Sequence, residues 1–406
     1  MLDANTRQLV KATVPVLKEH GVTLTSHFYQ RMFRHNPELK HLFNQGHQAS
    51  GQQQTALALA VLGYAENIDD PSVLAPVVGR IAHKHASLGI RAEHYPIVGG
   101  HLLASIREVL GDAASDELIA AWAAAYGQLA DILIAAEAEL YRNAALAEGG
   151  WSGWRPFKVG RKVRESDEIT SFYLYPVDGA PVPSFVPGQY ISVRGRAAGG
   201  ALIQPRQYSL SDAPNPEYLR LSIKREQGDA SRPDGLISNW MHDEVEEGTL
   251  VELAPPFGDF VLDTDKDSPV VLISGGVGLT PMVSMLNQLV QEQPTRRVAF
   301  VHAARNRQVH ALNDHVRSLA ERHPQLNVQV FYEHASNDDR LGVDYEHQGR
   351  IDLAAIRDTA IVPDADYYLC GPVPFMRAQL ASLQELGVPA ERIHYEVFGS
   401  HVLAAA

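Results

Sequence analysis

The spacing of apolar residues changes twice along this 406-residue chain, and these two changes constrain its fold more than any single motif. Up to about residue 143, apolar side chains recur at helical spacing and no stretch alternates as a strand would. Pro37, Pro71, Gly89 and Gly111 interrupt this pattern at points where a helix would have to end. We therefore predict an all-α domain of about six to eight helices, which can enclose an apolar cofactor pocket.

The first change of spacing follows residues 144–154, where the glycine-rich sequence AALAEGGWSGW breaks the helical period. Beyond it, Leu219, Leu221 and Ile223 alternate with polar residues, which is typical of an antiparallel strand with one buried face. Stretches such as ITSFYLYPV and GQYISVR have the composition of strands and are separated by turn residues. This part of the chain is expected to form a small antiparallel β-barrel.

The second change follows the charged connector DTDKDS at residues 263–268. The continuous apolar strand VVLIS (270–274) runs into the glycine loop GGVGLTPM (275–282), which begins a helix. Further strands and helices alternate after it, and this order predicts a parallel sheet covered by helices. We expect three domains, over residues 1–146, 147–264 and 265–406.

Charge and cysteine content exclude several classes of partner and site. The formal net charge of −13 would repel nucleic-acid phosphates and anionic lipid headgroups, so neither nucleic acid nor a membrane is expected as a partner. The single cysteine, Cys370, excludes intrachain disulfides and cysteine-rich metal sites, which fits a reducing compartment. The N-terminus lacks the apolar core of a signal peptide, and polar residues interrupt the apolar run at 118–140, which we interpret as a buried helix. We expect a cytoplasmic protein.

Two histidines compete for the role of a ligand in the stretch RIAHKHASLG (80–89). His85 continues an apolar stripe with Ile81 and Leu88, whereas His83 lies on the opposite, polar side. An inward-pointing imidazole needs partners for its ring nitrogens, and either a haem iron or a carbonyl group can supply one. These residues alone favour a core histidine bonded to a carbonyl and leave haem ligation as the alternative.

The strand RQYS (206–209) combines groups that suit a flavin nucleotide. Arg206 and Tyr208 share one face, so a guanidinium for a pyrophosphate and a ring for a flavin can be offered together. Ser209 lies on the other face and would need a local bend or its backbone to reach the flavin. Gly235 and Ser238, at the start of a short helix, could bring backbone N–H groups to a phosphate. The alternative is an ordinary barrel strand.

Two later segments suit a dinucleotide. The glycines of GGVGLTP (275–281) permit close approach of the backbone to a pyrophosphate, and Thr280 adds a hydroxyl at the start of the helix. Cys370, with the Gly-Pro that follows it, ends another strand at the edge where α/β sheets bind ligands. The alternative for this cysteine is a small buried residue followed by a turn.

Taken together, these segments resemble the flavohaemoglobins. HFYQRMFRHNPELKHLFN (27–44), Gln53, IAHKH (81–85) and Tyr95 are similar to the globin domain of that family, over the whole first third of the chain. RQYS, GGVGLTP and CGP, in this order, are similar to motifs of the ferredoxin–NADP reductase superfamily. The resemblance implies haem b, FAD and either NADH or NADPH as cofactors.

The resemblance also assigns roles to individual residues. In the haem pocket it implies His85 as iron ligand, Phe43 as the ring packed on the porphyrin, Tyr29 and Gln53 as polar groups facing bound oxygen, and Tyr95 and Glu137 behind His85, with Glu139 the alternative to Glu137. It implies cofactor contacts for Lys84, Tyr190, Arg206, Gln207, Tyr208, Ser209, Gly235, Ser238, Gly275, Gly276, Val277, Gly278, Leu279, Thr280, Cys370, Gly371, Pro372, Glu396, Val397, Phe398, Gly399 and Ser400. Phe398 would cover the flavin ring.

The activity that the resemblance implies is oxidation of nitric oxide by O₂ to nitrate, in a monomer that binds both gases. Electrons would pass from NADH or NADPH to FAD and then singly to haem. The alternatives are an oxygen-binding or gas-sensing globin, and an NAD(P)H-dependent reductase of flavins, ferric iron or hydroperoxides. Arg305 and Arg307 could meet the 2′-phosphate of NADPH, although surface arginines are more often solvated.

Overall fold

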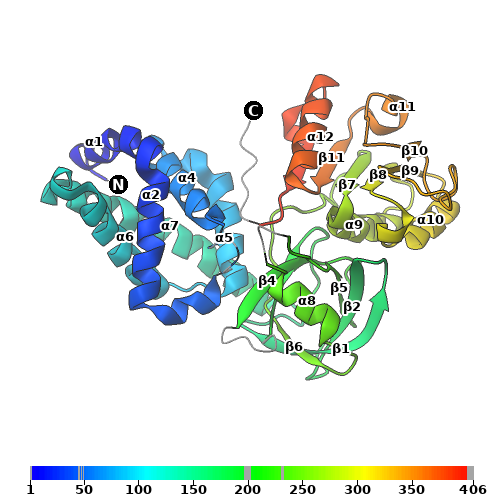
Figure 1. The fold of residues 1–406 in the computed structure, drawn as a ribbon, viewed down its shortest axis with the longest axis horizontal. Helices are drawn as coiled ribbons and strands as arrows, with labels where there is room; N and C mark the ends of the chain where they lie inside the picture. Colours follow the sequence, from blue (N-terminus) through cyan, green and yellow to red (C-terminus); the bar gives the residue numbers. More distant parts are fainter. Residues whose placement is uncertain are drawn as a thin grey trace.

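The computed structural model describes residues 2–43, 46, 48, 50–195, 203–229 and 233–399. Figure 1 shows a helical domain on one side and, on the other, a β-barrel below a sheet that is covered by helices. The predicted fold class, an all-α domain followed by an antiparallel barrel and a parallel-sheet domain, is confirmed. The structure does not test the exact domain boundaries, which stay predictions.

The helical domain consists of long α-helices joined by short 3₁₀ turns. They are α1 (Ala4–Ala12), α2 (Val14–His35), η1 (Pro37–Leu42), α4 (Gln52–Glu66), η2 (Pro71–Leu74), α5 (Ala75–Leu88), α6 (His94–Leu110), η3 (Gly111–Ala113) and α7 (Asp116–Leu146). The expected breaks occur: Pro37 and Pro71 begin 3₁₀ turns, and Gly89 ends α5 in the left-handed conformation with φ 77°. By length and composition α7 could cross a membrane, but it packs against α1, α5 and α6 and buries Trp122 and Glu137.

The second domain is a six-stranded antiparallel barrel with strand order β4-β3-β6-β1-β2-β5. Its elements are β1 (Arg155–Arg164), β2 (Ile169–Pro176), β3 (Tyr190–Gly195), β4 (Gln204–Ser209), β5 (Leu219–Lys224), α8 (Leu236–Asp243) and β6 (Leu250–Leu253). A bridge between Leu210 and Leu221 joins the end of β4 to β5, so the two outer strands of the sheet meet and close it. Phe157, Phe172 and Ile191 are among the side chains that fill the interior.

The prediction that β5 has one exposed face is wrong. Arg220 and Ser222, on its polar face, are only 6% and 3% exposed. Ser222 shares hydrogen bonds of 2.8 Å with both Ser171 and Ser211, while Arg220 pairs with Asp212 at 3.3 Å. The apolar residues of β5 face the interior of the barrel, as their alternation predicts. The polar residues between them form a buried polar layer and do not face solvent.

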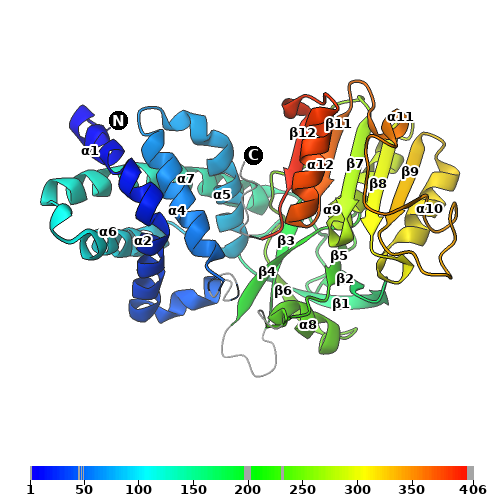
Figure 2. The ribbon, with the colours of Figure 1, turned by 45° about the horizontal axis from the view of Figure 1, so that its top comes forward.

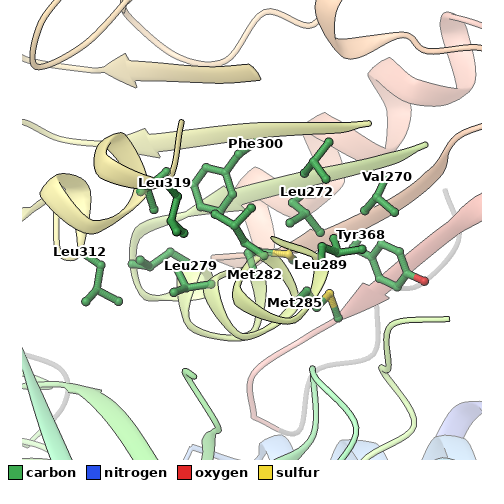
Figure 3. Packing of buried hydrophobic residues seen from close by; sticks show 14 of the residues in the cluster. Val270, Leu272, Leu279, Met282, Met285, Leu289, Phe300, Leu312, Leu319 and Tyr368 are labelled. Atoms are coloured by element: carbon green, nitrogen blue, oxygen red, sulfur yellow. The ribbon is translucent and has the colours of Figure 1, made fainter. Parts of the chain in front are cut away.

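The third domain is a parallel sheet with strand order β10-β9-β8-β7-β11-β12. Figure 2 shows β9, β8, β7, β11 and β12 side by side in this order. Its elements are β7 (Val270–Gly275), η4 (Gly276–Gly278), α9 (Leu279–Glu292), β8 (Val298–Ala304), η5 (Arg307–Val309), α10 (Asn313–Arg322), β9 (Leu326–Tyr332), β10 (His347–Gln348), α11 (Arg357–Ala360), β11 (Asp366–Cys370), α12 (Val373–Glu385), η6 (Ala390–Arg392) and β12 (Ile393–Glu396). Helices α9 and α10 cover one face and α11 and α12 the other, so each face has its own apolar core. Figure 3 shows Met282, Met285 and Leu289 of α9 packed with Leu272 and Phe300 of the sheet.

The order of the strands reverses between β7 and β11. The chain proceeds from β7 through β8 to β9 on one side, and then returns to place β11 on the other side of β7. Open α/β sheets bind ligands outside the carboxyl ends of the strands at such a switch point. Gly275 and Cys370 end these two strands, so the structure brings both predicted dinucleotide segments to the expected place.

Candidate active site

His85 is held from behind by two side chains of other helices. Its Nδ1 lies 2.7 Å from Oε1 of Glu137 on α7 and 3.1 Å from the hydroxyl of Tyr95 on α6. Tyr95 also donates to the same carboxylate oxygen, and Glu137 is only 2% exposed, whereas Glu139 is exposed. Burial and the neighbouring Glu137 raise the pKa of Tyr95, so its hydroxyl stays a donor. The expected grouping of these three residues is present, with Glu137 as the inward carboxylate.

This arrangement fits a haem ligand. A carboxylate can only accept, so Nδ1 of His85 holds its proton toward Glu137, and the ring nitrogen available to a metal is Nε2, on the other side of the ring. A carboxylate behind a metal-binding histidine fixes both the tautomer and the ring orientation. The sequence alone favoured a structural histidine bonded to a carbonyl group, but Nδ1 of His85 contacts a carboxylate and a hydroxyl instead. Nε2 is therefore the nitrogen that would bind iron.

Tyr29, Gln53 and Phe43 form a second group in the same domain. The hydroxyl of Tyr29 shares a hydrogen bond with the side chain of Gln53, and burial raises its pKa. The rings of Tyr29 and Phe43 are 5.7 Å apart in an edge-to-face arrangement. An apolar wall with one neutral phenol and one amide suits a small ligand that accepts a hydrogen bond.

The helix that carries His85 is also in contact with the barrel. The side chain of Lys84 donates to Oε1 of Gln207 on β4, and Nδ1 of His83 accepts the backbone N–H of Gly258 at 3.0 Å. The polar side of α5, on which His83 lies as predicted, is therefore a domain interface. Burial lowers the pKa of His83, which keeps it neutral and able to accept this bond.

Lys84 and Glu396 meet electrostatically at this junction. Burial lowers the pKa of Lys84 to about 8, with Glu396 acting against the shift and Arg206 adding to it. Burial, together with Asp259, raises the pKa of Glu396 to about 8, and Lys84 opposes that shift. Both groups are half-buried between the helical domain, the flavin strand and the last strand β12, and either can change charge near pH 8.

The residues of the flavin motif divide between the two faces of β4. Opposite them on β3, Tyr190 pairs with Ser209, whereas Ile191 of the barrel core pairs with Tyr208. Gln207 and Ser209 therefore share the face that meets α5, and Arg206 and Tyr208 share the other. Arg206 donates to the carbonyl of Pro205 and to Gln204, and burial lowers its pKa.

Two buried polar atoms at this junction have no hydrogen-bond partner within the described ranges: Oγ of Ser209 and Oε2 of Glu396. Native proteins rarely leave such atoms without a partner, so each calls for a ligand, a water or an ion. They lie on the two elements that the sequence assigned to the flavin. The residues present therefore fit FAD.

Gly235 and Ser238 open α8 as predicted, but Ser238 is already engaged. It is 5% exposed, and its hydroxyl donates to the carbonyl of Gly235 and accepts the N–H of Glu226. A Cβ at Gly235 would lie 2.7 Å from Cβ of Glu226. Close packing of this turn thus accounts for both residues, and a phosphate would meet the first backbone N–H groups of α8 instead.

The glycine loop has two structural roles. A Cβ at Gly278 would lie 2.3 Å from the carbonyl oxygen of Cys370, so this glycine lets the loop pack on the end of β11. The ring of Phe375 restricts larger side chains at two glycines, because a Cβ would lie 3.2 Å from the ring at Gly275 and 2.6 Å from it at Gly371. Gly276 differs, because it has φ 54° and open space where a Cβ would be. It is the glycine that best suits the approach of a pyrophosphate.

The hydroxyl of Thr280 is not presented to a ligand in this structure. Thr280 is 2% exposed and donates to the carbonyl of Val277 at 3.0 Å, which corrects the expectation of a free hydroxyl at the helix start. Leu279 lies in the core under the sheet, as does the side chain of Cys370. Burial raises the pKa of the Cys370 thiol well above its usual range, which fits the small buried residue of the alternative interpretation.

After β12 the chain passes close to the same junction. Val397 packs on the core of the α11 and α12 face, and Phe398 is 37% exposed, so its ring is available to a ligand. Gly399 has φ 103°, a conformation that favours glycine. Ser400, also predicted as a contact, lies outside the described residues.

Arg305 and Arg307 are not merely solvated. Arg305 pairs with Glu168 of the barrel, and Arg307 lies 3.6 Å from Asp344. Both remain more than half exposed, and exposed pairs of this kind are worth only about 0–1 kcal/mol.

Sequence reasoning missed two residues of this region. Asp259 is one of the charges that raise the pKa of Glu396, and Phe375 packs against both Gly275 and Gly371. Phe375 could have been suspected, because it follows the CGP segment on the helix that begins there. Nothing in the local sequence points to Asp259, because its partners come from distant parts of the chain.

The fold and the site define a class of protein: a haem-binding helical domain joined to FAD- and NAD-binding domains, which together make an NAD(P)H-dependent oxidoreductase. The family described as Globin matches residues 26–133, and that described as Oxidoreductase NAD-binding domain matches residues 272–380. The flavohemoprotein of Chromobacterium violaceum is 63% identical over 401 residues, which cover 99% of each chain. That of Rhizobium meliloti is 53% identical over 404 residues. The chain belongs to the flavohemoprotein family.

Solved structures agree with this assignment. The flavohemoglobin of Malassezia yamatoensis, with bound FAD and heme, has a TM-score of 0.87 and 29% identity, covering 98% of this chain and 100% of its own. The FAD/NAD-binding domain of nitric oxide dioxygenase from Vibrio cholerae has a TM-score of 0.55 and 40% identity, covering 60% of this chain and 98% of its own. Haem and FAD are accordingly cofactors of this protein, and its globin domain binds O₂.

Proposed function

We propose that this flavohemoprotein is a nitric oxide dioxygenase that acts as a monomer on O₂ and NO. The reaction would be NAD(P)H + 2 NO + 2 O₂ → NAD(P)⁺ + H⁺ + 2 NO₃⁻, in which NAD(P)H loses two electrons and each NO gains the two atoms of one O₂. When bound, FAD would convert the electron pair into single electrons, and haem would supply the site where the gases react.

The observation that carries this proposal is the contact between Lys84 and Gln207. Lys84 precedes the predicted haem ligand, and Gln207 lies within the flavin strand, so one hydrogen bond joins the two cofactor sites. A globin that only stores or senses gas needs no such electron supply. A relative of the reductase half, 40% identical, is described as a nitric oxide dioxygenase.

Individual side chains have separate tasks in this proposal. His85 would bind iron through Nε2. Glu137 would keep the proton of the imidazole on Nδ1 and make the imidazole a stronger electron donor to the iron. Tyr29, kept neutral by burial, would donate its hydroxyl proton in a hydrogen bond to bound O₂. Arg206 would hold the FAD pyrophosphate, and the loop at Gly276 that of NAD(P)H.

The test is NADH or NADPH oxidation by the purified holoprotein, measured with O₂ alone, with NO alone and with both. We expect rapid oxidation only with both gases, two NO consumed per NAD(P)H, and nitrate as the product. Oxidation that is unaffected by NO, but stimulated by ferric chelates, flavins or hydroperoxides, would overturn the proposal in favour of a general reductase. Slow oxidation under all conditions would favour an oxygen-binding or sensing globin.

A further inference from the structure

A polar cluster joins the barrel to the third domain. It consists of the buried Ser211, Arg220, Ser284 and Asn287 and the half-buried Asp212, Tyr218 and His315. Asp212 is at its centre: Oδ1 accepts the side-chain amide of Asn287 at 2.6 Å, and its backbone carbonyl accepts the hydroxyl of Ser284 at 2.7 Å. Both donors are on α9, and they are 4% and 0% exposed. No predicted site residue belongs to this cluster.

The carboxylate of Asp212 is also held by side chains of its own domain, independently of α9. Oδ2 accepts the hydroxyl of Tyr218 at 3.0 Å and lies 3.3 Å from the guanidinium of Arg220, which is 6% exposed. On the other side, Oδ1 of Asn287 meets Nε2 of His315 on α10 at 2.7 Å. Each amide atom of Asn287 thus has a partner, so the side chain is held in one orientation.

Along the chain, this cluster lies close to both the flavin strand β4 and the glycine loop that precedes α9. Asp212 follows the flavin strand after two residues, and the bridge at Leu210 holds that segment on the barrel. At the other end, α9 starts directly after the glycine loop at Gly276–Gly278. Met285 of the same helix also reaches the residues just before Tyr190 of β3, because a Cβ at Gly188 would lie 2.7 Å from its Cε. One helix therefore runs from the dinucleotide loop to residues that flank both β3 and β4.

We propose that Asp212 and Asn287 are a positioning pair that sets the distance between the nicotinamide and flavin sites, and thereby the rate of hydride transfer. The physical reason is the steep dependence of transfer on geometry, because a misplacement of 1 Å can cost on the order of 10²-fold in rate. Apolar packing alone allows a helix to slide, whereas a hydrogen-bonded carboxylate fixes one register. The inference concerns reduction of FAD by NAD(P)H and does not depend on NO being the substrate.

The test is the variant Asn287→Asp in the full-length holoprotein, which keeps the shape of the side chain but places two carboxyl groups in contact. Anaerobic stopped-flow reduction of FAD, with whichever of NADH and NADPH reduces the parent faster, gives a limiting rate and a dissociation constant. At pH 8 we expect the limiting rate to fall at least about tenfold, with the dissociation constant and the FAD and haem contents within about twofold of the parent.

At pH 6 we expect recovery of most of the rate, because two carboxyl groups in contact share a proton and the new one can then donate as the amide did. The charged and titratable groups around this pair are Tyr218 and Arg220 from the barrel and His315 and Arg322 from α10. Because these groups can also titrate in the parent, the pH profile of the variant is compared with that of the parent. The melting temperature of the variant should rise between pH 8 and 6 more than that of the parent. This second measurement requires no turnover.

Gln293→Glu is the matched control. It makes the same amide-to-acid change at the residue that directly follows α9, where the side chain of Gln293 donates to the carbonyls of Thr264 and Lys266 and does not touch the barrel cluster. Its limiting rate should stay within about twofold of the parent at both pH values. If Asn287→Asp does not fold, Ser284→Ala is expected to slow hydride transfer several-fold at an unchanged dissociation constant. A parental limiting rate in Asn287→Asp at pH 8, or in Ser284→Ala, would overturn the proposal.

Discussion

Nδ1 of His85 and Oε1 of Glu137 lie 2.7 Å apart, although 52 residues separate them in the chain. The hydroxyl of Tyr95 contacts both, so the carboxylate accepts two donors in a site that is almost closed to solvent. Such a partner increases the electron donation of the imidazole through its other nitrogen and favours the higher oxidation state of a bound metal. Glu137 of α7 would thus tune the electronic character of the haem through His85.

Replacing Glu137 with Gln should raise the reduction potential of the haem iron. The amide can still accept from Nδ1–H but carries no charge, so the ferric state loses stabilisation. We expect the equilibrium constant for reduction of the haem iron to rise about tenfold, which corresponds to about 59 mV for one electron. Spectroelectrochemistry measures this potential. Glu139→Gln, an exposed position on the same helix, is the control. An equal potential in parent and Glu137→Gln would show that the carboxylate does not act on the iron.

Replacing His85 with Ala should remove haem from the protein and abolish NO-dependent turnover, while FAD is still reduced by NADH. Haem content is measured by absorption of the purified protein. His83→Ala is the control and should keep its haem, because His83 faces Gly258 of the barrel. Normal haem occupancy in His85→Ala would contradict the ligand assignment. His101 is a poor substitute, since Arg31 and Asn36 occupy its two ring nitrogens.

Sequence reasoning predicted the parts of the molecule that local spacing determines. The two changes of apolar period located three kinds of domain, because a helix and a strand each bury a face with its own repeat. The inward direction of His85 followed in the same way. The contacts of Lys84, Asp212 and Asn287 could not be derived, because their partners lie on other domains and no local pattern records which surfaces meet.

The errors have the same origin. Arg220 and Ser222 look like solvent-facing positions, yet they form a buried polar layer at the side of the barrel that carries Asp212. His83 does lie on the polar side of α5, but no local pattern shows that this side is an interface. Thr280 was expected to offer its hydroxyl to a phosphate, but the nearby carbonyl of Val277 accepts it. A polar residue in a sequence shows that a partner is needed, not which partner is found.

Replacing Arg206 with Ala should weaken FAD binding. A guanidinium that donates to a pyrophosphate makes hydrogen bonds between charged groups, worth about 1.5–3 kcal/mol, so the dissociation constant should rise roughly 10- to 150-fold. The measurement is FAD release by fluorescence during dilution or ultrafiltration. Arg194→Ala on β3, where the guanidinium pairs with Glu252, serves as control. Unchanged flavin affinity in Arg206→Ala would contradict the flavin assignment of β4.

Replacing Glu396 with Gln should change how stability depends on pH. The pKa of Glu396 is raised from 4.5 to about 8 in the folded protein, so between these values the folded state binds more protons and stability falls as the pH rises. The pKa of Lys84 is lowered to about 8, so its contribution changes only above that pH, where stability rises again.

The variant should therefore lose the decline between pH 5 and 8 that the parent shows, and it should melt at a higher temperature than the parent at pH 8. Differential scanning calorimetry of the two full-length proteins measures this. Glu391→Gln, an exposed glutamate close by in sequence, should follow the parent curve. Parallel curves for Glu396→Gln and the parent would mean that Glu396 is ionised at all these pH values.

Replacing Tyr29 with Phe separates a packing role from a binding role. Its ring packs on Phe28, Phe33 and Phe43, and the substitution keeps these contacts while removing only the hydroxyl that meets Gln53. If the hydroxyl donates to bound O₂, its loss should cost about 1–3 kcal/mol, which is roughly 5- to 150-fold in affinity. The loss should appear mainly as faster O₂ release, because the bond forms after the gas has entered. Stopped-flow O₂ release measures it, and reduction of FAD by NADH should be unchanged. Release rates within about twofold of the parent would assign Tyr29 to packing and make Gln53 the next donor to test.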